Sequence, residues 1–241
     1  VAVWGNSFYG QTEIPAALSD VVQISAGFRS VFALKGDGIV VAWGGFGNGS
    51  SFILPAFTKK IVTLAAGHSH ALAAASDGIV QAWGDNSQGQ ITVPAGLSDI
   101  VAVSAGHSHS LALKADGTVV GWGWNLKGQA TIPTGLSGVV SIAAGDYHSV
   151  ALKSDGSVVV WGDDTAKVTT LPSGLSSVTS VASANRYGVA GKSDGTVVVW
   201  DPDFGGSVVR VLPWSLAGVS RVAAGYRHAL AVMVPPPLDI T

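Results

Sequence analysis

The chain repeats itself with a period of about 39 residues, and this period constrains the fold more than any other feature. Six tryptophans, 39 or 40 residues apart, mark the repeat: Trp4, Trp43, Trp83, Trp122, Trp161 and Trp200. Five of them are followed by glycine, and Asp201 takes its place after the sixth. A regular period of roughly 20 to 50 residues is the signature of solenoids and propellers, so one repeat defines one structural unit.

Each unit also carries an Ala-Gly marker and a proline at constant positions. The marker glycines are Gly27, Gly67, Gly106, Gly145 and Gly225, with Ala184 in the remaining copy. Between the markers a unit spells four short strand-like segments, such as "VVSIAAG", "HSVALK", "SVVVWG" and "QATIP". Asp-Gly turns join the second segment to the third in five units, which is a strong hairpin signal. Four strands at this period predict the blade of a β-propeller.

The number of turns predicts how the ring closes. Six Trp segments and six Ala-Gly segments accompany only five Asp-Gly turns, and the missing turn would join Met233 to Val1. The prediction is an all-β fold: a closed six-bladed β-propeller of four-stranded blades, with N- and C-terminal strands sharing one blade. Such sharing would leave no exposed strand edge at the seam. We expect residues 1–234 to form one propeller domain and the proline-rich residues 235–241 to begin a linker or tail.

The composition excludes several classes of protein. With 47% hydrophobic and 12% charged residues, the chain can bury a large core and is not a disordered protein. Its net charge of -2 offers no broad attraction for nucleic acid or an anionic membrane. The absence of cysteine removes disulfides, thiolate nucleophiles and cysteine-based zinc sites. No apolar run is long enough to span a bilayer, so we expect no membrane insertion.

The unit "AGHSHSLALKADGTVVGWGWNLKGQATIP" combines Gly-x-x-His with an apolar strand and a later Trp-Gly. This pattern resembles the repeat of the regulator of chromosome condensation family, and the likeness covers essentially residues 1–233. The short unit looks most like bacterial members, such as the propeller-type β-lactamase inhibitors. The resemblance implies a secreted or surface-exposed bacterial protein that binds a protein partner through the loops at one end of the propeller.

Comparison of the six internal copies places the variable positions at one end of the blades. The loop after the Ala-Gly marker and the loop after the Trp share this end, whereas the Asp-Gly turns lie at the other. Framework positions repeat because every blade packs alike, while loops free of that demand can diverge toward a partner. Aromatic and arginine side chains, which dominate interface hot spots, gather in three consecutive units. The predicted partner-binding residues are Phe8, Tyr9, Phe28, Arg29, Phe46, Arg186, Tyr187, Phe204, Tyr226 and Arg227.

The histidines fall into two groups. Four share one repeat position, three residues after the marker glycine, and this recurrence predicts a framework hydrogen bond: His70, His109, His148 and His228. His68 and His107 lie off that position and could share a metal if both pointed into the channel. Two ligands alone do not make a metal site, so the prediction includes no metal.

The other chemical signals are weak. The acidic residues lie largely in the Asp-Gly turns, where aspartate stabilises a reverse turn, and they form no evident carboxylate pair for glycoside hydrolysis. No Gly-x-Ser-x-Gly nucleophile elbow is present beside a suitable histidine and acid. We therefore expect no enzyme and no cofactor. The six repeated tryptophans are expected in the core, while Trp124 and Trp214 are candidates for a sugar-binding surface.

The function predicted from these features is a non-catalytic, monomeric protein-binding propeller. Its narrower form is the inhibition of a secreted hydrolase such as a β-lactamase. Two alternatives stay open at this level, namely a carbohydrate-binding propeller and an architectural module of a larger cell-surface protein. A glycan is therefore a possible ligand, whereas nucleic acid is not expected.

Overall fold

The computed structural model describes residues 1–45, 53–164, 168–200, 219–225 and 229–233. The chain divides into two compact units, Val1–Asn125 and Leu126–Thr241, and each is described by itself. The described residues form antiparallel sheets and no helix that could cross a membrane. All-β structure is thus confirmed, while the prediction of a single domain over residues 1–234 stays a prediction.

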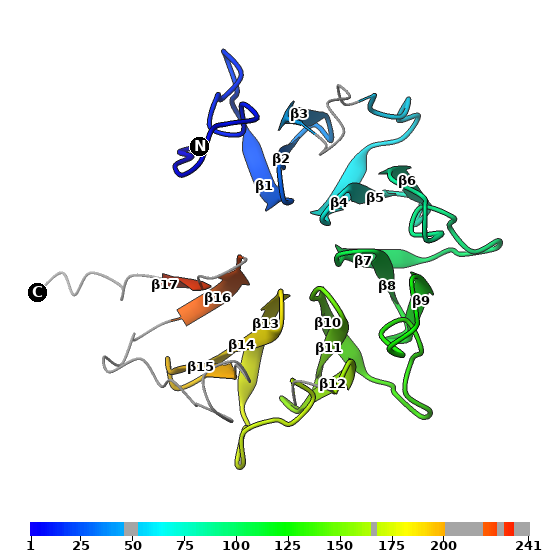
Figure 1. The fold of residues 1–241 in the computed structure, drawn as a ribbon, viewed down its shortest axis with the longest axis vertical. Coiled ribbons are helices and arrows are strands. Elements are labelled where there is room, and N and C mark those ends of the chain that lie inside the picture. The colour runs from blue at the N-terminus through cyan, green and yellow to red at the C-terminus, as the bar shows by residue number, and fades with distance from the viewer. Residues whose placement is uncertain (46–52, 165–167, 201–218, 226–228, 234–241) are drawn as a thin grey trace, which may run out of the picture. The chain divides into compact units, whose positions relative to one another are not determined.

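In the part of the first unit that the structure describes, three sheets of three strands follow one another along the chain (Figure 1). Their strands are β1 (Val21–Ala26), β2 (Ser30–Lys35), β3 (Val40–Gly44), β4 (Ile61–Ala66), β5 (His70–Ala75), β6 (Val80–Gly84), β7 (Ile100–Ala105), β8 (His109–Lys114) and β9 (Val119–Gly123). In each sheet the middle strand is buried throughout almost its whole length. Each sheet is therefore one blade, with its second strand in the interior.

The described residues of the second unit form two sheets of three strands and one of two. Their strands are β10 (Val139–Ala144), β11 (His148–Lys153), β12 (Val158–Gly162), β13 (Val178–Ala184), β14 (Tyr187–Lys192), β15 (Val197–Trp200), β16 (Val219–Ala224) and β17 (Ala229–Met233). A bulge recurs near the start of the first strand of all six sheets, between Val21 and Gln23 in β1 and between Val219 and Arg221 in β16. The sequence repeat is therefore also a repeat of backbone register.

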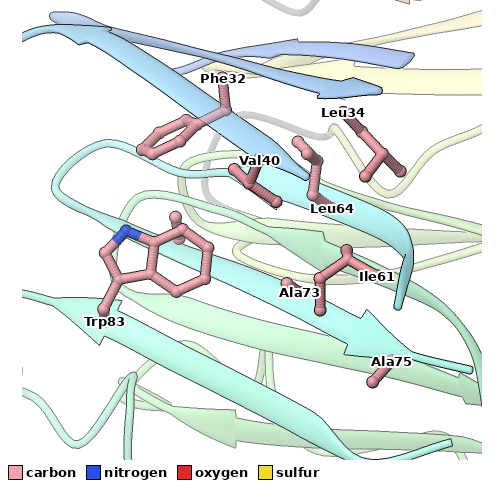
Figure 2. Close-up of a cluster of buried hydrophobic side chains, with 9 residues drawn as sticks. Phe32, Leu34, Val40, Ile61, Leu64, Ala73, Ala75 and Trp83 are labelled. Atoms are coloured by element: carbon pink, nitrogen blue, oxygen red, sulfur yellow. The ribbon is translucent and has the colours of Figure 1, made fainter. Parts of the chain in front are cut away.

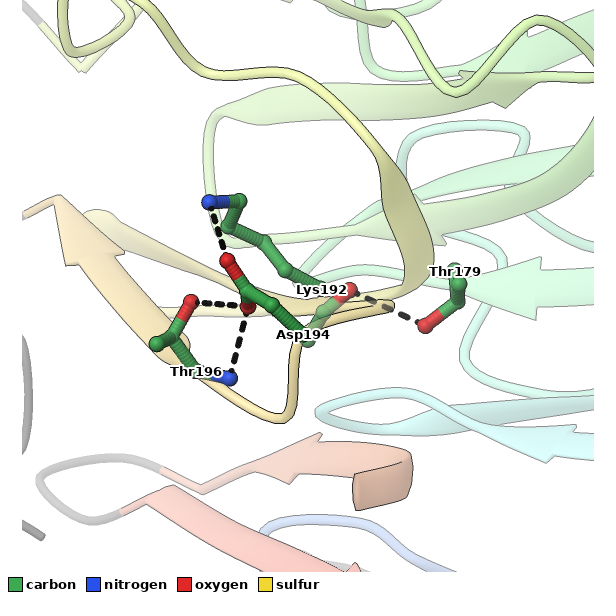
Figure 3. A network of polar contacts seen from close by, with 5 residues as sticks. Thr179, Lys192, Asp194 and Thr196 are labelled. Atoms are coloured by element: carbon green, nitrogen blue, oxygen red, sulfur yellow. Dashed lines mark hydrogen bonds and ion pairs between the residues drawn. The ribbon is translucent and has the colours of Figure 1, made fainter. Parts of the chain in front are cut away.

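The Asp-Gly turns join the second and third strands, as the sequence predicted. In the turn between β14 and β15, the Asp194 carboxylate accepts hydrogen bonds from the Thr196 backbone N–H at 2.9 Å and the Thr196 hydroxyl at 2.6 Å (Figure 3). Lys192 adds an ion pair at 2.9 Å. The following Gly195 has a φ of 82°, a left-handed conformation that glycine adopts without strain. The turn residues thus satisfy the backbone where the chain reverses.

The core lies between neighbouring sheets. Between the first two sheets, Phe32 and Leu34 of β2 pack against Ile61 and Leu64 of β4 and against Trp83 of β6 (Figure 2). Five of the six repeated tryptophans are buried, with exposed fractions of 1 to 7%, which confirms their predicted core role: Trp43, Trp83, Trp122, Trp161 and Trp200. Burial of large apolar side chains between blades is the main stabilising contribution in this arrangement.

The prediction of four-stranded blades is wrong, because the described sheets have at most three strands. The fourth predicted segment forms no strand, and it packs against the following blade. The Trp161 indole N–H donates to the Gln129 carbonyl at 2.9 Å, and Trp43 bonds Gln11 in the same way. The tryptophan N–H groups donate to carbonyl oxygens of the segment and fix its position. The segment therefore needs no backbone pairing with a neighbouring strand.

The N-terminal strand predicted for the shared blade is not formed among the described residues, while the meeting of the two termini in one blade stays a prediction. Strand β17 pairs only with β16 among the described residues, and Val1–Gly5 belongs to no strand. Trp4, which was expected in the core of that shared blade, is 76% exposed. The physical reason is that the segment around Gln11, which was expected to close the ring, packs against the blade that follows it. The Trp43 indole N–H of β3 donates to the Gln11 carbonyl.

Candidate functional site

In the first unit, the two variable loops of each blade meet at one end, as the internal comparison predicted. In the first blade, the Gly45 backbone N–H after β3 donates to the Arg29 carbonyl between β1 and β2, at 2.9 Å. In the second blade the Asp85 backbone N–H donates to the Ser69 carbonyl, and in the third the Trp124 backbone N–H donates to the Ser108 carbonyl. This end of the first unit, called here the loop end, is therefore held by backbone hydrogen bonds.

The marker glycines bring neighbouring loops into contact. A Cβ atom placed on Gly27 would overlap the Gly67 carbonyl oxygen, and one on Gly67 would overlap the Gly106 carbonyl oxygen. Only a residue without a side chain permits this approach. The His68 backbone N–H, next to the second marker, donates to the Gly106 carbonyl at 3.1 Å. Residues directly after the markers are consequently forced close together.

Three rings at this repeat position form a stack across three blades. Phe28 lies against His68 with ring centroids 4.5 Å apart and planes 14° apart. His68 in turn lies against His107, with centroids 4.2 Å and planes 27° apart. Parallel rings at these distances are an attractive arrangement for aromatic pairs.

Arg29 joins this stack to a second loop. Its guanidinium carbon lies over the Tyr9 ring at 4.0 Å and over the Phe28 ring at 5.0 Å, which are cation–π distances. Tyr9 also contacts Phe8 edge to face, with centroids 4.9 Å apart. We call this set of side chains the loop-end cluster: Phe8, Tyr9, Phe28, Arg29, His68 and His107.

The loop-end cluster is partly open to solvent. Phe8 is 81% exposed, Phe28 51% and Tyr9 37%, while Arg29 and the two histidines are half-buried. Burial lowers the pKa of His68 below its ordinary value of 6.5, and the charges of His107 and Arg29 act in the same direction. His68 is therefore mostly neutral at neutral pH.

The geometry of the two histidines disfavours a shared metal ion. Stacked imidazoles hold their in-plane lone pairs nearly parallel, so the lone pairs do not converge on one point. Each Nδ1 is instead 2.8 to 2.9 Å from the hydroxyl of the serine that follows it, Ser69 or Ser108. No group of three or more potential metal ligands occurs among the residues that the structure describes.

Two histidines of the other group, His70 and His148, make the predicted framework bonds, whereas His228 lies outside the described residues. His70 is fully buried, and its Nε2 lies 3.0 Å from the Ser110 hydroxyl of the next blade. Ser110 donates its own proton to the Gln90 carbonyl at 2.8 Å, so His70 donates to Ser110. His148 similarly pairs with Ser183 at 2.7 Å. Burial lowers the pKa of both His70 and His148 to about 4, so both are neutral bridges between blades.

The second unit contributes one predicted residue to its surface and one to its core. Arg186 is exposed beside Asn185, which has a φ of 41°. Tyr187 is only 6% exposed, and its hydroxyl donates to the Gly225 carbonyl. It occupies the repeat position of His70 and His148, so it is a framework side chain and not an exposed contact. That shared position was the signal that could have corrected the prediction.

Four predicted partner-binding residues lie outside the described residues, namely Phe46, Phe204, Tyr226 and Arg227, as does Trp214. The predicted grouping of three consecutive blades therefore stays a prediction. Trp124 is half-buried. The structure adds His68 and His107 to the candidate site, although the sequence had suggested only a metal-binding role for them. Their position directly after successive marker glycines was the signal that they would stack.

These features define a class of protein, an all-β repeat protein of antiparallel blades with diversified loops at one end. Three of its units, residues 61–90, 100–129 and 139–166, match the family model of the regulator of chromosome condensation (RCC1) repeat. These three units thus match the RCC1 repeat, which confirms the resemblance to this repeat family that the sequence shows. The match covers less than half of the chain.

Solved structures show the same kind of fold. Yeast RCC1 (Prp20), from a complex with Kap60, is similar with a TM-score of 0.76 and 22% identity over 95% of this chain and 74% of that one. The ectodomain of the Physcomitrella patens receptor kinase CR4 gives 0.73 and 23% over 94% and 62%. Human WBSCR16 gives 0.72 and 19% over 88% and 74%. These likenesses show an RCC1-like propeller fold, and the chain has no match among curated protein sequences.

Proposed function

We propose that the chain is a non-catalytic protein-binding module and that the loop-end cluster is part of its binding face. The observation that carries this proposal is the contact of Arg29 with Tyr9 and Phe28, continued by the ring stack to His107. Loops of three blades thereby present aromatic and arginine side chains together. These residue types supply most of the binding energy in protein interfaces.

The cluster is organised before a partner arrives. The Tyr9 backbone N–H donates to the Gln11 side chain at 2.8 Å, and the Phe8 N–H donates to Asn6 at 2.8 Å, so the first turn is held internally. Rings that already contact one another lose little conformational entropy on association. The Asp-Gly end differs, because its exposed apolar side chains, such as Ile39 and Ile79, are single aliphatic residues in a repeated turn. The loop end is therefore the better binding face.

The similar proteins support a role in binding. Prp20 of Saccharomyces cerevisiae has been solved with Kap60 and described for its binding to Gsp1p and histones. By analogy of fold we assign this chain a protein partner, with the chain itself acting as a monomer. The finer proposal is a secreted or surface-exposed bacterial protein that inhibits a hydrolase. An assay of β-lactamase activity with the purified chain added tests it, and unchanged activity across a panel of secreted β-lactamases would reject it.

The binding face is tested by quantitative capture of partners from extracts of the source organism. The double variant Tyr9→Ala, Arg29→Ala removes the centre of the cluster, and we expect it to lose the partner that the wild-type chain retains. The matched control is Ile39→Ala, Ile79→Ala, which removes two exposed apolar side chains at the opposite end and should retain the partner. Circular dichroism establishes that both variants are folded. Equal retention by the two variants would place the binding face elsewhere.

A further inference from the structure

The loop-end cluster carries positive charge in an apolar setting. Arg29 supplies a permanent cation, and the charges that act on His68 are those of His107 and Arg29, both of which disfavour its protonation. The carboxylate of Asp85 follows β6 at the same end, but it accepts bonds from Ser87 and Gln90 at 2.8 Å each. Glu13 lies on the turn after Tyr9, close to Gly10. Neither carboxylate is among the charges that act on His68.

We propose that the loop-end cluster binds an acidic segment of a protein partner, with Arg29, His68 and His107 receiving its carboxylates. Phe8, Tyr9 and Phe28 then pack against the apolar side chains that accompany those carboxylates. This inference rests on the proposed function and names the chemistry of the partner.

The geometry of the cations favours carboxylates. A guanidinium with a ring against its face makes hydrogen bonds in its own plane, where its fork of N–H groups matches the two oxygens of a carboxylate. The Nδ1 atom of His68 is engaged with Ser69, so a carboxylate would meet this side chain through Nε2. The stack places the next imidazole 4.2 Å away, within reach of the same acidic segment.

The proposal implies binding that strengthens as the pH falls. Near pH 7.5 His68 is neutral, because burial and the charges of His107 and Arg29 keep its pKa below 6.5. A carboxylate beside an imidazole favours the protonated form, so the bound state takes up a proton more readily than the free state. Acidification from pH 7.5 to pH 6 should therefore tighten binding by about threefold or more, if the partner's carboxylates stay ionised.

The experiment uses two synthetic copolymers of opposite charge with the same aromatic content, poly(Glu,Tyr) and poly(Lys,Tyr). Each is immobilised, and the binding of the full chain is measured by interferometry at pH 7.5 and pH 6. We expect binding to poly(Glu,Tyr) and none to poly(Lys,Tyr). Arg29→Gln should weaken the binding by about tenfold or more, and Arg29→Lys, which retains the charge but not the fork, by less.

Two further variants separate the cluster from general charge effects. Lys59→Gln removes an exposed cation near the start of β4, at the Asp-Gly end, and should leave the affinity unchanged. His68→Gln, His107→Gln should abolish the pH dependence. The inference is overturned if Arg29→Gln and Lys59→Gln have equal effects, if the pH dependence survives without the histidines, or if single-stranded DNA binds as tightly as poly(Glu,Tyr).

The failure of this inference is distinguishable from that of the proposed function. If partner capture depends on Tyr9 and Arg29 but poly(Glu,Tyr) does not bind, the binding face stands and its acidic specificity is rejected. If capture is independent of these residues, the proposed function itself fails. Binding of poly(Glu,Tyr) that is lost in Arg29→Gln and retained in Lys59→Gln supports both.

Discussion

The indole N–H of Trp122 donates a hydrogen bond to the carbonyl of Gln90, which lies 2.9 Å away and 32 residues earlier in the chain. The same separation recurs between Trp161 and Gln129 and between Trp200 and Val168. A tryptophan on the third strand of one blade thus holds the segment that arrives from the preceding blade. Among the described residues this bond is made by Trp43, Trp122, Trp161 and Trp200, and each time it ties a blade to the segment that precedes it in the chain.

Removing this bond should destabilise the protein. Trp122→Phe retains an aromatic ring but takes away the N–H group that bonds the Gln90 carbonyl, and it leaves a small cavity in the core. We expect the free energy of unfolding to fall by about 1 to 3 kcal/mol. Urea denaturation followed by circular dichroism measures this change.

The matched control is Trp4→Phe. Trp4 has the same place in the sequence repeat but is 76% exposed. Its substitution should change the free energy of unfolding by no more than about 0.5 kcal/mol. An equal loss of stability in both variants would mean that Trp4 is buried and would contradict the described arrangement of the N-terminal residues.

Ser110 links the Gln90 carbonyl to the buried His70, and its substitution offers a second test of this arrangement. Ser110→Ala leaves the His70 Nε2–H group without its acceptor and takes one of the two donors from Gln90. The expected loss is about 1 to 3 kcal/mol, since a buried polar group without a partner pays its full desolvation cost. Ser76→Ala, in the exposed turn after β5, is the control and should be nearly neutral. Similar unfolding curves for the two variants would argue against the His70–Ser110–Gln90 chain of bonds.

Periodic features of the sequence predicted most of the blade but not its fourth segment. Alternating apolar residues, the Asp-Gly turns and the constant tryptophan positions each act within a blade, so they could be recognised locally. The period of a tandem repeat, however, does not say at which residue one structural unit ends and the next begins. The segment ending at Pro133 could follow the strand before it or precede the strand after it, and the Trp161 bond to Gln129 selects the second choice. Sequence periodicity alone does not contain that information.

The candidate site shows the same limit. Phe8, Tyr9, Phe28 and Arg29 were predicted from the divergence of their loops, and the structure brings them into one cluster. The participation of His68 was missed, because ring stacking depends on how closely the marker glycines approach each other. Tyr187 was predicted at the surface from its residue type, but it is buried. It occupies the repeat position of the buried histidines, three residues after the marker.

The close approach of the marker glycines predicts a severe effect of adding a single methyl group. In Gly67→Ala the new Cβ would overlap the Gly106 carbonyl and lie 2.7 Å from the His70 ring. Backbone and a buried ring can yield only by separating the blades, so we expect a loss of about 3 kcal/mol or more. Gly45→Ala is the control, because nothing lies within 4 Å of its Cβ position. Comparable melting temperatures for the two variants would contradict the packing of the loop end.

The buried histidines predict that the protein loses stability in mild acid. His70 and His148 have a pKa of about 4 in the folded chain, whereas an exposed histidine titrates near 6.5. Between these values the unfolded chain binds more protons, so stability is complete above about pH 6.5 and falls as the pH approaches 4. At pH 5 each histidine should cost the folded state about 2 kcal/mol relative to pH 7.5.

The size of this acid effect can be assigned to one residue by His70→Gln. Glutamine retains an N–H donor for Ser110 but does not titrate, so the variant should lose about 2 kcal/mol less than the wild type between pH 7.5 and pH 5. The variant will be less stable at pH 7.5 if the shorter side chain bonds poorly, but that offset does not change with pH. Urea titrations at several pH values give both quantities. Parallel stability curves for the two proteins would show that His70 has the same pKa in the folded and the unfolded chain, which would contradict its burial as a neutral side chain bonded to Ser110.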